Sequence, residues 1–550
     1  MTSSVPKTAS NGRAIIGSPS GFSGPLPPEH FNMAAYVIGR AASTVPGKIA
    51  LIVYDNAESA VPSETWTFAQ IERAVLRIAQ GLRERGLKKG DRLLIRLDNT
   101  STYALMFFGA IAAGLVPLAT SVHLTPDEAR FLATDSNARA VALAEHLVGA
   151  ATAECNAGID IIKADDVAAM LCGPEASGYA DTNANDPAYM VYTSGTTANP
   201  KGVVHAQRAA WGRRPMYQGW YGITPDDRML HAGAFNWTFT LGSGLTDPWA
   251  NGATAIIYTG EKSPDIWPRL IRRTKATLFA AVPGLFRQIL KYARAGDLAD
   301  LERLRHGLMA GETPPPSLLN DWLQATGRPL YEALGMSEIS TYISTSPVVA
   351  VKPGSVGCPQ PGRTVAILPE DAAGGQHERI TPVRIGEPGL LAVHTSDPGL
   401  MLGYWQRPDE DAEVRSGAWF VGGDLAAMDA EGYVRHLGRA NDIMKALGYR
   451  VAPQEVEAVL ARHPAVGEVA CAERQVSNSV SVIAAYIVPA SPEISRDEDA
   501  VLTYAREHLA PYKVPRKIIW VERLPRTANG KILRRALETA PPLRSPRLFQ

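Results

Sequence analysis

The chain has 550 residues, 45% of them hydrophobic, and its 55 Lys and Arg side chains are balanced by 55 Asp and Glu. A net charge of zero argues against nucleic acid or an anionic membrane surface as a main partner. No stretch of the sequence approaches the ~20 uninterrupted apolar residues that a membrane-spanning helix needs. The four cysteines lie far apart and predict neither a zinc site nor a disulfide framework, which favours a reduced, cytoplasmic location.

A chain of this length exceeds one hydrophobic core, so we expect several domains. Residues 1–28 are rich in Ser, Gly and Pro, and we expect them to form a disordered tail. Segments of helical and strand period then alternate, which is typical of layered α/β subdomains with mostly parallel sheets. The predicted helices cover 67–85, 102–113, 263–273, 283–293 and a segment that starts with Thr125 and Pro126; the predicted strands cover 91–97, 116–119, 188–192, 253–258, 276–282 and 307–310.

The pattern changes at about residue 344, where Gly and Pro recur every few residues, and this predicts a β-rich subdomain over 344–438. From residue 439 to 550 we expect a compact α+β domain, with a capping box of Ser495 and Glu498 at the start of its last helix. The predicted fold class is α/β. An N-terminal region over 29–438, with two layered α/β subdomains and the small β subdomain, precedes the C-terminal domain.

A segment rich in hydroxyl groups and glycine follows the strand predicted over 188–192: Thr193-Ser194-Gly195-Thr196-Thr197-Ala198-Asn199-Pro200-Lys201-Gly202. Such a turn can bring several backbone N–H groups to one point, and the lysine adds a positive charge, which together suit a phosphate. On composition alone, a polar surface turn is the alternative. The order of residues resembles the Thr/Ser-Gly-Thr-Thr-Gly-x-Pro-Lys-Gly signature of the adenylate-forming enzymes, which include acyl-CoA synthetases, peptide-synthetase adenylation domains and luciferases.

Five later segments resemble further motifs of the same superfamily, in the same order. Residues 309–313 resemble its adenine-site turn, with Ala310 for the first glycine, and 331–338 its Tyr-Gly-x-Thr-Glu box, with Ser337 for threonine. Residues 419–424 resemble its Trp-Phe-x-Thr-Gly-Asp motif, 438–450 its hinge and thioester loop, and 525–531 its terminal box. Each segment alone has an ordinary alternative, such as a turn or a solvated basic tail. The resemblance runs through nearly the whole chain after the tail and implies a mobile C-terminal domain.

The resemblance also implies roles for the matched residues. The residues implied in ATP binding are Thr193, Ser194, Gly195, Thr196, Thr197, Lys201, Gly311, Glu312, Thr313, Glu332, Ala333, Leu334, Gly335, Met336, Ser337, Asp424, Arg439 and Lys531. The implied catalytic residues are Thr193, Lys201, Lys531 and Glu338, of which Glu338 would bind Mg²⁺, a hard cation that takes oxygen ligands. Asp424 would accept hydrogen bonds from the ribose hydroxyls.

The hinge and thioester loop carries the roles implied for the second half of the reaction. Asn441 falls on the pivot about which the C-terminal domain would turn. The residues implied in CoA binding are Lys445, Gly448, Tyr449 and Arg450.

The acyl pocket is expected between residues 231–245 and two strand ends at Ala310 and Gly335. Asn236 stands where amino-acid-activating relatives carry Asp, so an α-ammonium group would lack its counter-charge, which is costly in a buried site. With Phe235 and Trp237 beside it, the pocket should fit a ring or a short bulky acid, although these aromatic residues could also belong to the core.

These features predict an ATP-, Mg²⁺- and CoA-dependent acyl-CoA synthetase that activates an apolar cyclic, aromatic or short- to medium-chain carboxylic acid through an acyl-AMP. Within the superfamily, the chain resembles benzoate-CoA and cyclohexanecarboxylate-CoA ligases. An aryl-AMP ligase that loads a carrier protein and a non-catalytic adenylate-binding protein are the alternatives. The latter would be expected to have lost Lys531 or Glu338. The sequence leaves monomer and homodimer open.

Overall fold

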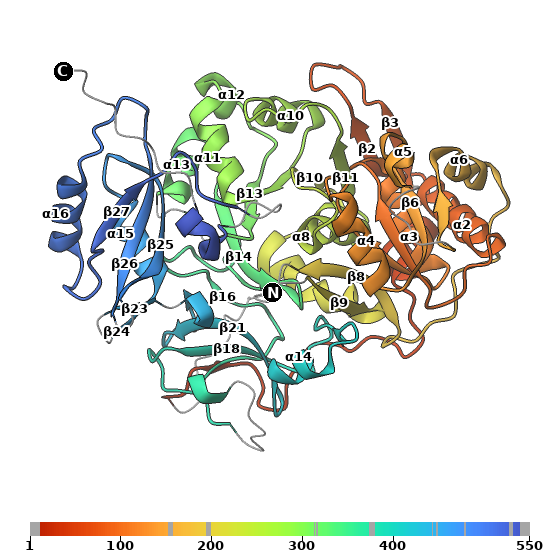
Figure 1. Ribbon diagram of the computed structural model, residues 1–550. Helices are drawn as coiled ribbons and strands as arrows, with labels where there is room; N and C mark the ends of the chain where they lie inside the picture. Colours follow the sequence, from red (N-terminus) through yellow and green to blue (C-terminus); the bar gives the residue numbers. More distant parts are fainter. Residues whose placement is uncertain are drawn as a thin grey trace.

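The computed structural model describes residues 12–151, 158–193, 200–312, 314, 317–372, 380–442, 444–446, 449–477, 480–526 and 532–539. Two large α/β sheets lie side by side, a smaller antiparallel sheet lies against them, and the C-terminal domain stands at one end, beside β13 and β14 (Figure 1). This arrangement confirms the predicted α/β fold class.

The first large sheet holds the predicted strand over 188–192 and the strand that follows it. Its order is β19 (Gly403–Tyr404), β9 (Lys201–Ala206), β8 (Pro187–Thr193), β5 (Val116–Ala119), β4 (Arg92–Arg96), β6 (Ala138–Leu143) and β7 (Asp160–Ile162). The pairs from β8 to β7 are parallel, whereas β9 and β19 are antiparallel additions at one edge. Leu93, Leu94 and Ile95 are buried in succession, as expected for a parallel strand covered on both faces.

The second large sheet contains β13, which precedes the predicted adenine turn, and β14, which carries most of the 331–338 motif. Its order is β16 (Cys358–Pro359), β15 (Ser340–Ser344), β14 (Leu330–Met336), β13 (His306–Ala310), β12 (Leu278–Ala281), β10 (Arg228–His231), β11 (Thr254–Tyr258), β2 (Ile49–Tyr54) and β3 (Glu64–Thr67). The strands from β14 to β2 are parallel. Their carboxyl ends therefore share one edge, where open α/β sheets bind ligands.

Helix α3 (Ser101–Ala112) joins the two sheets and is buried on every face. Phe107 packs against Tyr189 of β8, and Phe108 packs against Trp249, whose indole N–H donates to the β2 carbonyl of Ala50. An all-round apolar helix is the pattern expected of an inner layer. The other helices of these layers are α1 (Arg40–Thr44), α2 (Phe68–Glu84), α4 (Pro126–Asp135), α5 (Val148–Ala151), α6 (Ala164–Cys172), α7 (Arg214–Met216), α8 (Thr238–Leu241), α9 (Asp247–Ala250), α10 (Ile266–Thr274), α11 (Pro283–Tyr292), α12 (Ala295–Ala299) and α13 (Leu318–Thr326).

The smaller sheet is antiparallel and involves the N-terminal segment. It orders β1 (Ile15–Ile16), β17 (Val365–Leu368), β18 (Gly389–His394), β21 (Trp419–Met428) and β20 (Arg415–Ser416), with β22 (Val434–Arg439) also paired to β21 and α14 (Pro408–Glu413) before β20. The region over 344–438 is not a closed unit, because β16 and β19 within it pair with the two large sheets.

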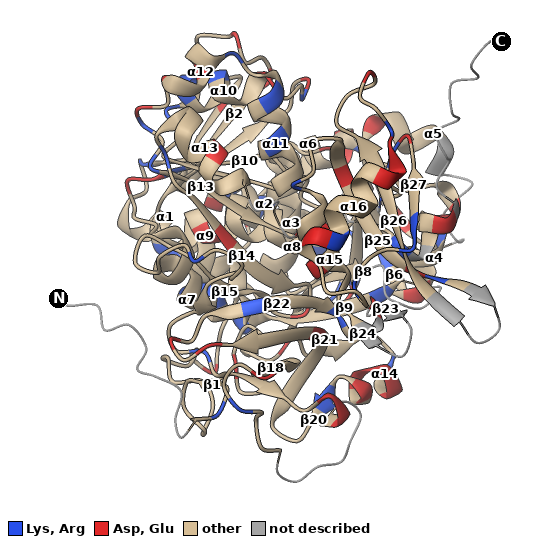
Figure 2. Ribbon diagram, turned by 90° about the vertical axis from the view of Figure 1, so that its left-hand side faces the viewer, with Lys and Arg blue, Asp and Glu red and all other residues tan. Residues whose placement is uncertain are grey.

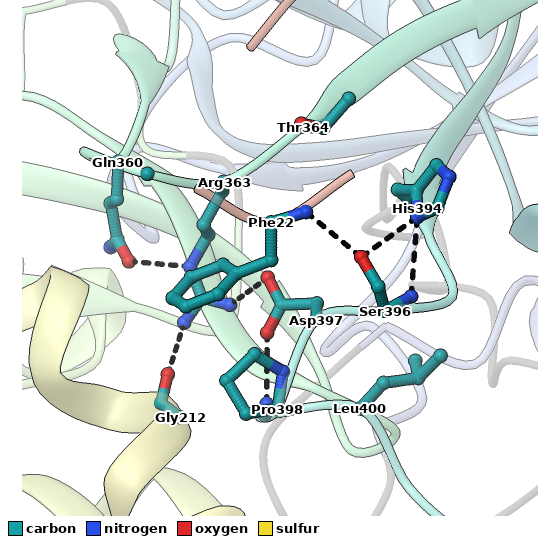
Figure 3. A network of polar contacts seen from close by, with 12 residues as sticks. Phe22, Gly212, Gln360, Arg363, Thr364, His394, Ser396, Asp397, Pro398 and Leu400 are labelled. Carbon is teal, nitrogen blue, oxygen red and sulfur yellow. Dashed lines mark hydrogen bonds and ion pairs between the residues drawn. The ribbon is translucent and has the colours of Figure 1, made fainter. Parts of the chain in front are cut away.

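The expected disordered tail is therefore wrong for residues 12–28. Ile15 and Ile16 pair with Ala366 and Val365, and the Phe22 N–H donates to Ser396 Oγ at 2.8 Å. Phe22 lies over a buried ion pair of Arg363 and Asp397 at 2.6 Å, and Arg363 also donates to the Gly212 carbonyl at 2.9 Å, which connects the small sheet to the rest of the chain (Figure 3). Residues 1–11 lie outside the described part.

The C-terminal domain contains β23 (Met444–Ala446), β24 (Tyr449–Val451), α15 (Pro453–Leu460), β25 (Val466–Ser477), β26 (Val480–Pro489), α16 (Glu498–His508) and β27 (Lys517–Trp520). The predicted capping box is wrong: α16 begins after Asp497, whose side chain accepts from the Ala500 N–H. Asp497 caps the helix because it directly precedes the first turn.

Charged side chains connect the C-terminal domain to the second large sheet. Arg287 of α11 lies 3.3 Å from Glu468 of β25, Glu468 lies 2.9 Å from Arg526, and Arg526 lies 3.6 Å from Glu312 after β13. Elsewhere, acidic and basic residues are scattered over the ribbon (Figure 2), in keeping with the net charge of zero. Among the residues that the structure describes, no helix combines the length and the apolar composition of a membrane span.

Candidate functional site

The segment predicted to bind phosphate joins two antiparallel strands. Thr193 ends β8, Lys201 begins β9, and the two are paired across the hairpin. Lys201 forms an ion pair with Glu410 of α14, and its ammonium lies 5.2 Å from the centre of the Tyr404 ring. The lysine is thus held by a carboxylate and an aromatic face, both supplied by a segment far along the chain.

Tyr404 connects this lysine to the predicted magnesium ligand. Its hydroxyl donates to Glu338 Oε1 at 2.7 Å, and the Met401 N–H donates to the Glu338 carbonyl at 2.7 Å. Burial, and then the neighbouring Glu338, raise the pKa of Tyr404, so the phenol remains a donor at neutral pH. Lys201 and Glu338, predicted from separate motifs, therefore meet on one tyrosine that sequence reasoning did not identify.

A buried histidine fixes the turn that carries Glu338. His205 of β9 stacks on Tyr189 at 4.6 Å, and its Nε2 lies 2.8 Å from the Ser337 carbonyl. Burial lowers the pKa of His205 to about 4, so the ring is neutral and Nε2–H is the donor. This contact holds the backbone between Ser337 and Glu338 against the first sheet.

A buried ion pair supports the other side of the same turn. Arg213 donates to both carboxylate oxygens of Asp247, at 2.8 and 2.6 Å, and to Ser340 Oγ at 2.5 Å. Ser340 has a positive φ of 72°, which is uncommon for a residue other than glycine. A Cβ atom at Gly242 would lie 1.9 Å from the Arg213 guanidinium, so only glycine fits there.

The predicted ribose ligand lies in the small sheet, close to β14. Asp424 of β21 is buried, and its Oδ1 lies 3.0 Å from His436 Nε2 and 3.1 Å from Arg439 Nε. A Cβ atom at Gly422 would lie 2.6 Å from Met336 Sδ, so β21 touches the end of β14. Asp424 and Arg439 are thus brought together beside Met336, with His436 as a partner that the sequence did not indicate.

The predicted adenine turn follows β13. Gly311 has a φ of 101°, and a Cβ atom there would lie 2.4 Å from the Trp237 ring. In the adjacent β14, Glu332 is buried and pairs in register with Met309. Burial raises the pKa of Glu332 to about 8, so this side chain is mostly a neutral acid at pH 7.

The predicted acyl-pocket residues take different environments. Phe235 is buried in the main core, and so is Phe239, whereas Trp237 is partly buried and reaches Gly311. Asn236 lines a cavity of about 460 Å³. Ala310 is the last residue of β13, and Gly335 lies within β14, close to the expected strand ends.

That cavity lies where the two large sheets meet, and sequence reasoning missed most of its lining. Asn99 and Tyr103 line it and hold the 233–235 loop: Asn99 Oδ1 accepts from the Phe235 N–H at 2.8 Å, and the Tyr103 hydroxyl donates to the Phe235 carbonyl at 3.3 Å. Its other lining side chains include Asp98, His123, Tyr258 and Lys262. Burial lowers the pKa of Lys262.

Several predicted site residues cannot be placed. Outside the described residues lie Ser194, Gly195, Thr196, Thr197, Thr313, Gly448 and Lys531. The backbones of Asn441, Lys445, Tyr449 and Arg450 are described without their side chains. Arg526, within the terminal box, forms an antiparallel bridge with Ile532, directly after the box, and also contacts Glu312 of the adenine turn.

Adenylate-forming ligases have a characteristic architecture. Two α/β sheets carry polar motifs where they meet, and a separate α+β domain lies beside this place. Residues 38–405 match the family model described as AMP-binding enzyme, and residues 455–531 match the model of the AMP-binding enzyme C-terminal domain. The chain therefore belongs to the AMP-binding enzyme family and is an AMP-forming acid–CoA ligase of that family.

Three similar proteins illustrate this relationship. Benzoate–CoA ligase of Thauera aromatica is 31% identical over 529 residues, covering 93% of this chain and 97% of the relative. The 3-hydroxybenzoate–CoA ligase of Aromatoleum sp. is 29% identical over 479 residues, covering 85% of this chain and 90% of the relative. The crystal structure of the anthranilate CoA ligase AuaEII in complex with anthranoyl-AMP has a TM-score of 0.83, with 25% identity over 93% of this chain and 98% of that chain.

Proposed function

We propose that the enzyme activates an apolar, ring-containing carboxylic acid with ATP and transfers the acyl group to CoA. The observation that carries this proposal is the meeting of Lys201 and Glu338 on Tyr404. The named relatives that act on benzoate and 3-hydroxybenzoate support the choice of an aromatic acid. Asn236, Trp237 and Phe235 carry no charge, so they offer no partner to the ammonium group of an amino acid.

The first half-reaction must bring two anions together. The substrate carboxylate attacks the α-phosphorus of ATP, pyrophosphate leaves, and an acyl-adenylate remains. Lys201, with the hydroxyl-rich loop before it, and Lys531 would offset the repulsion and hold the in-line geometry. Asp424 would hold the ribose, and the turn at Gly311 and Glu312 would lie against the adenine.

Magnesium fits this site through Glu338. Its carboxylate is half-buried next to the predicted phosphate segment and has one oxygen occupied by Tyr404. Mg²⁺ binds through few carboxylates and many phosphate and water oxygens, so one protein ligand suffices. When bound, the ion would neutralise phosphate charge.

In the second half-reaction, the C-terminal domain would turn about Asn441 and bring the loop that contains Lys445, Gly448, Tyr449 and Arg450 to the adenylate. The CoA sulfur would then attack the acyl carbon, and AMP would leave. We also infer a cytoplasmic location, because Cys172, Cys358 and Cys471 are free thiols.

Separate assays of the two half-reactions test this assignment. Lys531→Ala should abolish pyrophosphate release from ATP and benzoate, yet retain thioester formation from supplied benzoyl-AMP and CoA. The matched control is Lys517→Ala, which removes an exposed lysine of β27 in the same domain. Equal losses in both half-reactions would refute the role of Lys531. Adenylate formation without transfer to CoA in the wild type would indicate a carrier-protein acceptor.

A further inference from the structure

Two buried polar side-chain atoms next to the predicted acyl pocket have no hydrogen-bond partner among the described residues. They are His231 Nε2, at the end of β10, and Thr240 Oγ1, in α8. His231 is 6% exposed and Thr240 is fully buried. A buried polar group without a partner loses its hydrogen bonds to water without replacement, so two such groups in one short segment require an explanation.

The protonation of His231 follows from its contacts. Its Nδ1 accepts from the Gly233 N–H at 2.9 Å, so the proton of the neutral ring lies on Nε2. Burial, and then the charge of Lys262, lower the pKa of His231 to about 3, so the ring stays neutral at pH 7. Nε2–H is therefore a fixed donor.

Thr240 Oγ1 and the His231 ring both lie against Gly233. A Cβ atom at Gly233 would be 2.4 Å from Thr240 Oγ1 and 2.9 Å from His231 Cε1, so Gly233 has room only because it lacks a side chain. The hydroxyl of Thr240 can donate or accept. Together the two groups present one donor and one adaptable partner to a small polar group.

A row of aromatic rings connects this point to the nucleotide side of the site. Trp237 contacts Gly311 of the adenine turn, Phe239 lies 5.4 Å from Trp237, and His231 lies 4.5 Å from Phe239, each pair edge to face. Such a wall suits a ring whose carboxylate points toward the nucleotide and whose far side points toward His231.

We propose that His231 and Thr240 form a subsite for a hydroxyl group on the substrate, so that the enzyme selects hydroxylated ring acids. The substrate oxygen accepts from His231 Nε2–H, and its proton is donated to Thr240 Oγ1. This inference rests on the proposed function and names its substrate class. A site built to hydrogen-bond a hydroxyl group rejects analogues that lack it, because its own groups are then left unpaired.

The test compares thioester formation from benzoate, the three hydroxybenzoates and the corresponding methoxybenzoates. The wild type should prefer one hydroxybenzoate over benzoate in kcat/KM by about tenfold or more, and its methoxy analogue should lose this advantage because it cannot donate. His231→Phe should abolish the preference, mainly through KM, while the rate with benzoate changes less. His231→Gln, which keeps an N–H donor, should restore part of it.

Two further variants separate recognition from stability. Thr240→Val should reduce the preference without removing a ring. His306→Phe is the matched control, because His306 is an equally buried histidine whose Nε2 already lies 2.8 Å from the Tyr221 carbonyl; this variant should lose stability but keep the substrate ratio.

Failure of the inference and failure of the proposed function give different results. Equal use of benzoate and every hydroxybenzoate by the wild type, or a preference that survives in both His231→Phe and Thr240→Val, would overturn the subsite. If His231→Phe does not fold, the wild-type substrate series and Thr240→Val decide the question. A wild type that releases no pyrophosphate with any carboxylic acid would refute the proposed function and this inference with it.

Discussion

Glu332 should make the stability of the N-terminal region depend on pH, and Glu332→Gln should remove that dependence. Burial raises the pKa of its carboxyl from 4.5 to about 8 in the folded chain. The folded state therefore binds a proton that the unfolded state releases over this range, and stability is lost as the pH rises from about 4.5 to 8. At about 1.4 kcal/mol per pH unit, the loss approaches roughly 5 kcal/mol at the upper end.

Thermal unfolding measured at intervals between pH 5 and 9 tests this expectation. Glutamine is neutral in both states, so the melting temperature of Glu332→Gln should rise relative to the wild type as the pH increases, by several degrees at pH 8. The matched control is Glu413→Gln, which removes an exposed carboxylate of α14 and should follow the wild-type curve. Parallel wild-type and Glu332→Gln curves over the whole range would show that burial does not govern this carboxyl.

Three further variants probe the site. Trp237→Ala should open volume beside Gly311 and shift activation toward longer acids; an unchanged acid profile would place the pocket elsewhere. Tyr404→Phe removes the donor to Glu338 and should raise the Mg²⁺ concentration needed for half-maximal pyrophosphate release by about tenfold, whereas an unaltered Mg²⁺ titration would argue against this positioning role. Asp424→Ala should weaken ATP binding by ~1.5–3 kcal/mol for each ribose hydrogen bond lost, and an ATP titration like that of the wild type would rule out the ribose assignment.

Local pattern was sufficient to predict the elements that frame the site. The apolar run before Thr193 is β8, the turn after Ala310 ends β13, and Pro126 begins α4, because each depends on side chains within a few residues. The family models confirm the superfamily resemblance. This resemblance could be predicted because the order of the motifs can be read from the sequence alone.

Contacts between distant segments could not be predicted in this way. The N-terminal segment has a composition typical of disorder, yet Ile15 pairs with Ala366, a partner that no local pattern reveals. Tyr404 acquires its importance only because β19 pairs with β9 and places its ring between Lys201 and Glu338. Whether a buried polar atom such as His231 Nε2 has a hydrogen-bond partner likewise depends on the packing around it, which cannot be read from one sequence.

One row of charged side chains has a consequence for experiments on the whole enzyme. It joins the C-terminal domain to the second large sheet and consists of Arg287, Glu468, Arg526 and Glu312. Their side chains keep between 19% and 33% of their surface in contact with solvent, so dissolved ions can screen them. The screening length falls from about 30 Å at 0.01 M salt to about 10 Å at 0.1 M, which weakens the attachment of the C-terminal domain in the arrangement seen here. If that domain turns between half-reactions as proposed, ionic strength affects the relative populations of the arrangement seen here and the turned arrangement. If this arrangement, in which Arg526 of the terminal box contacts Glu312 of the adenine turn, is the one that forms adenylate, low salt should favour accumulation of adenylate and higher salt its transfer to CoA.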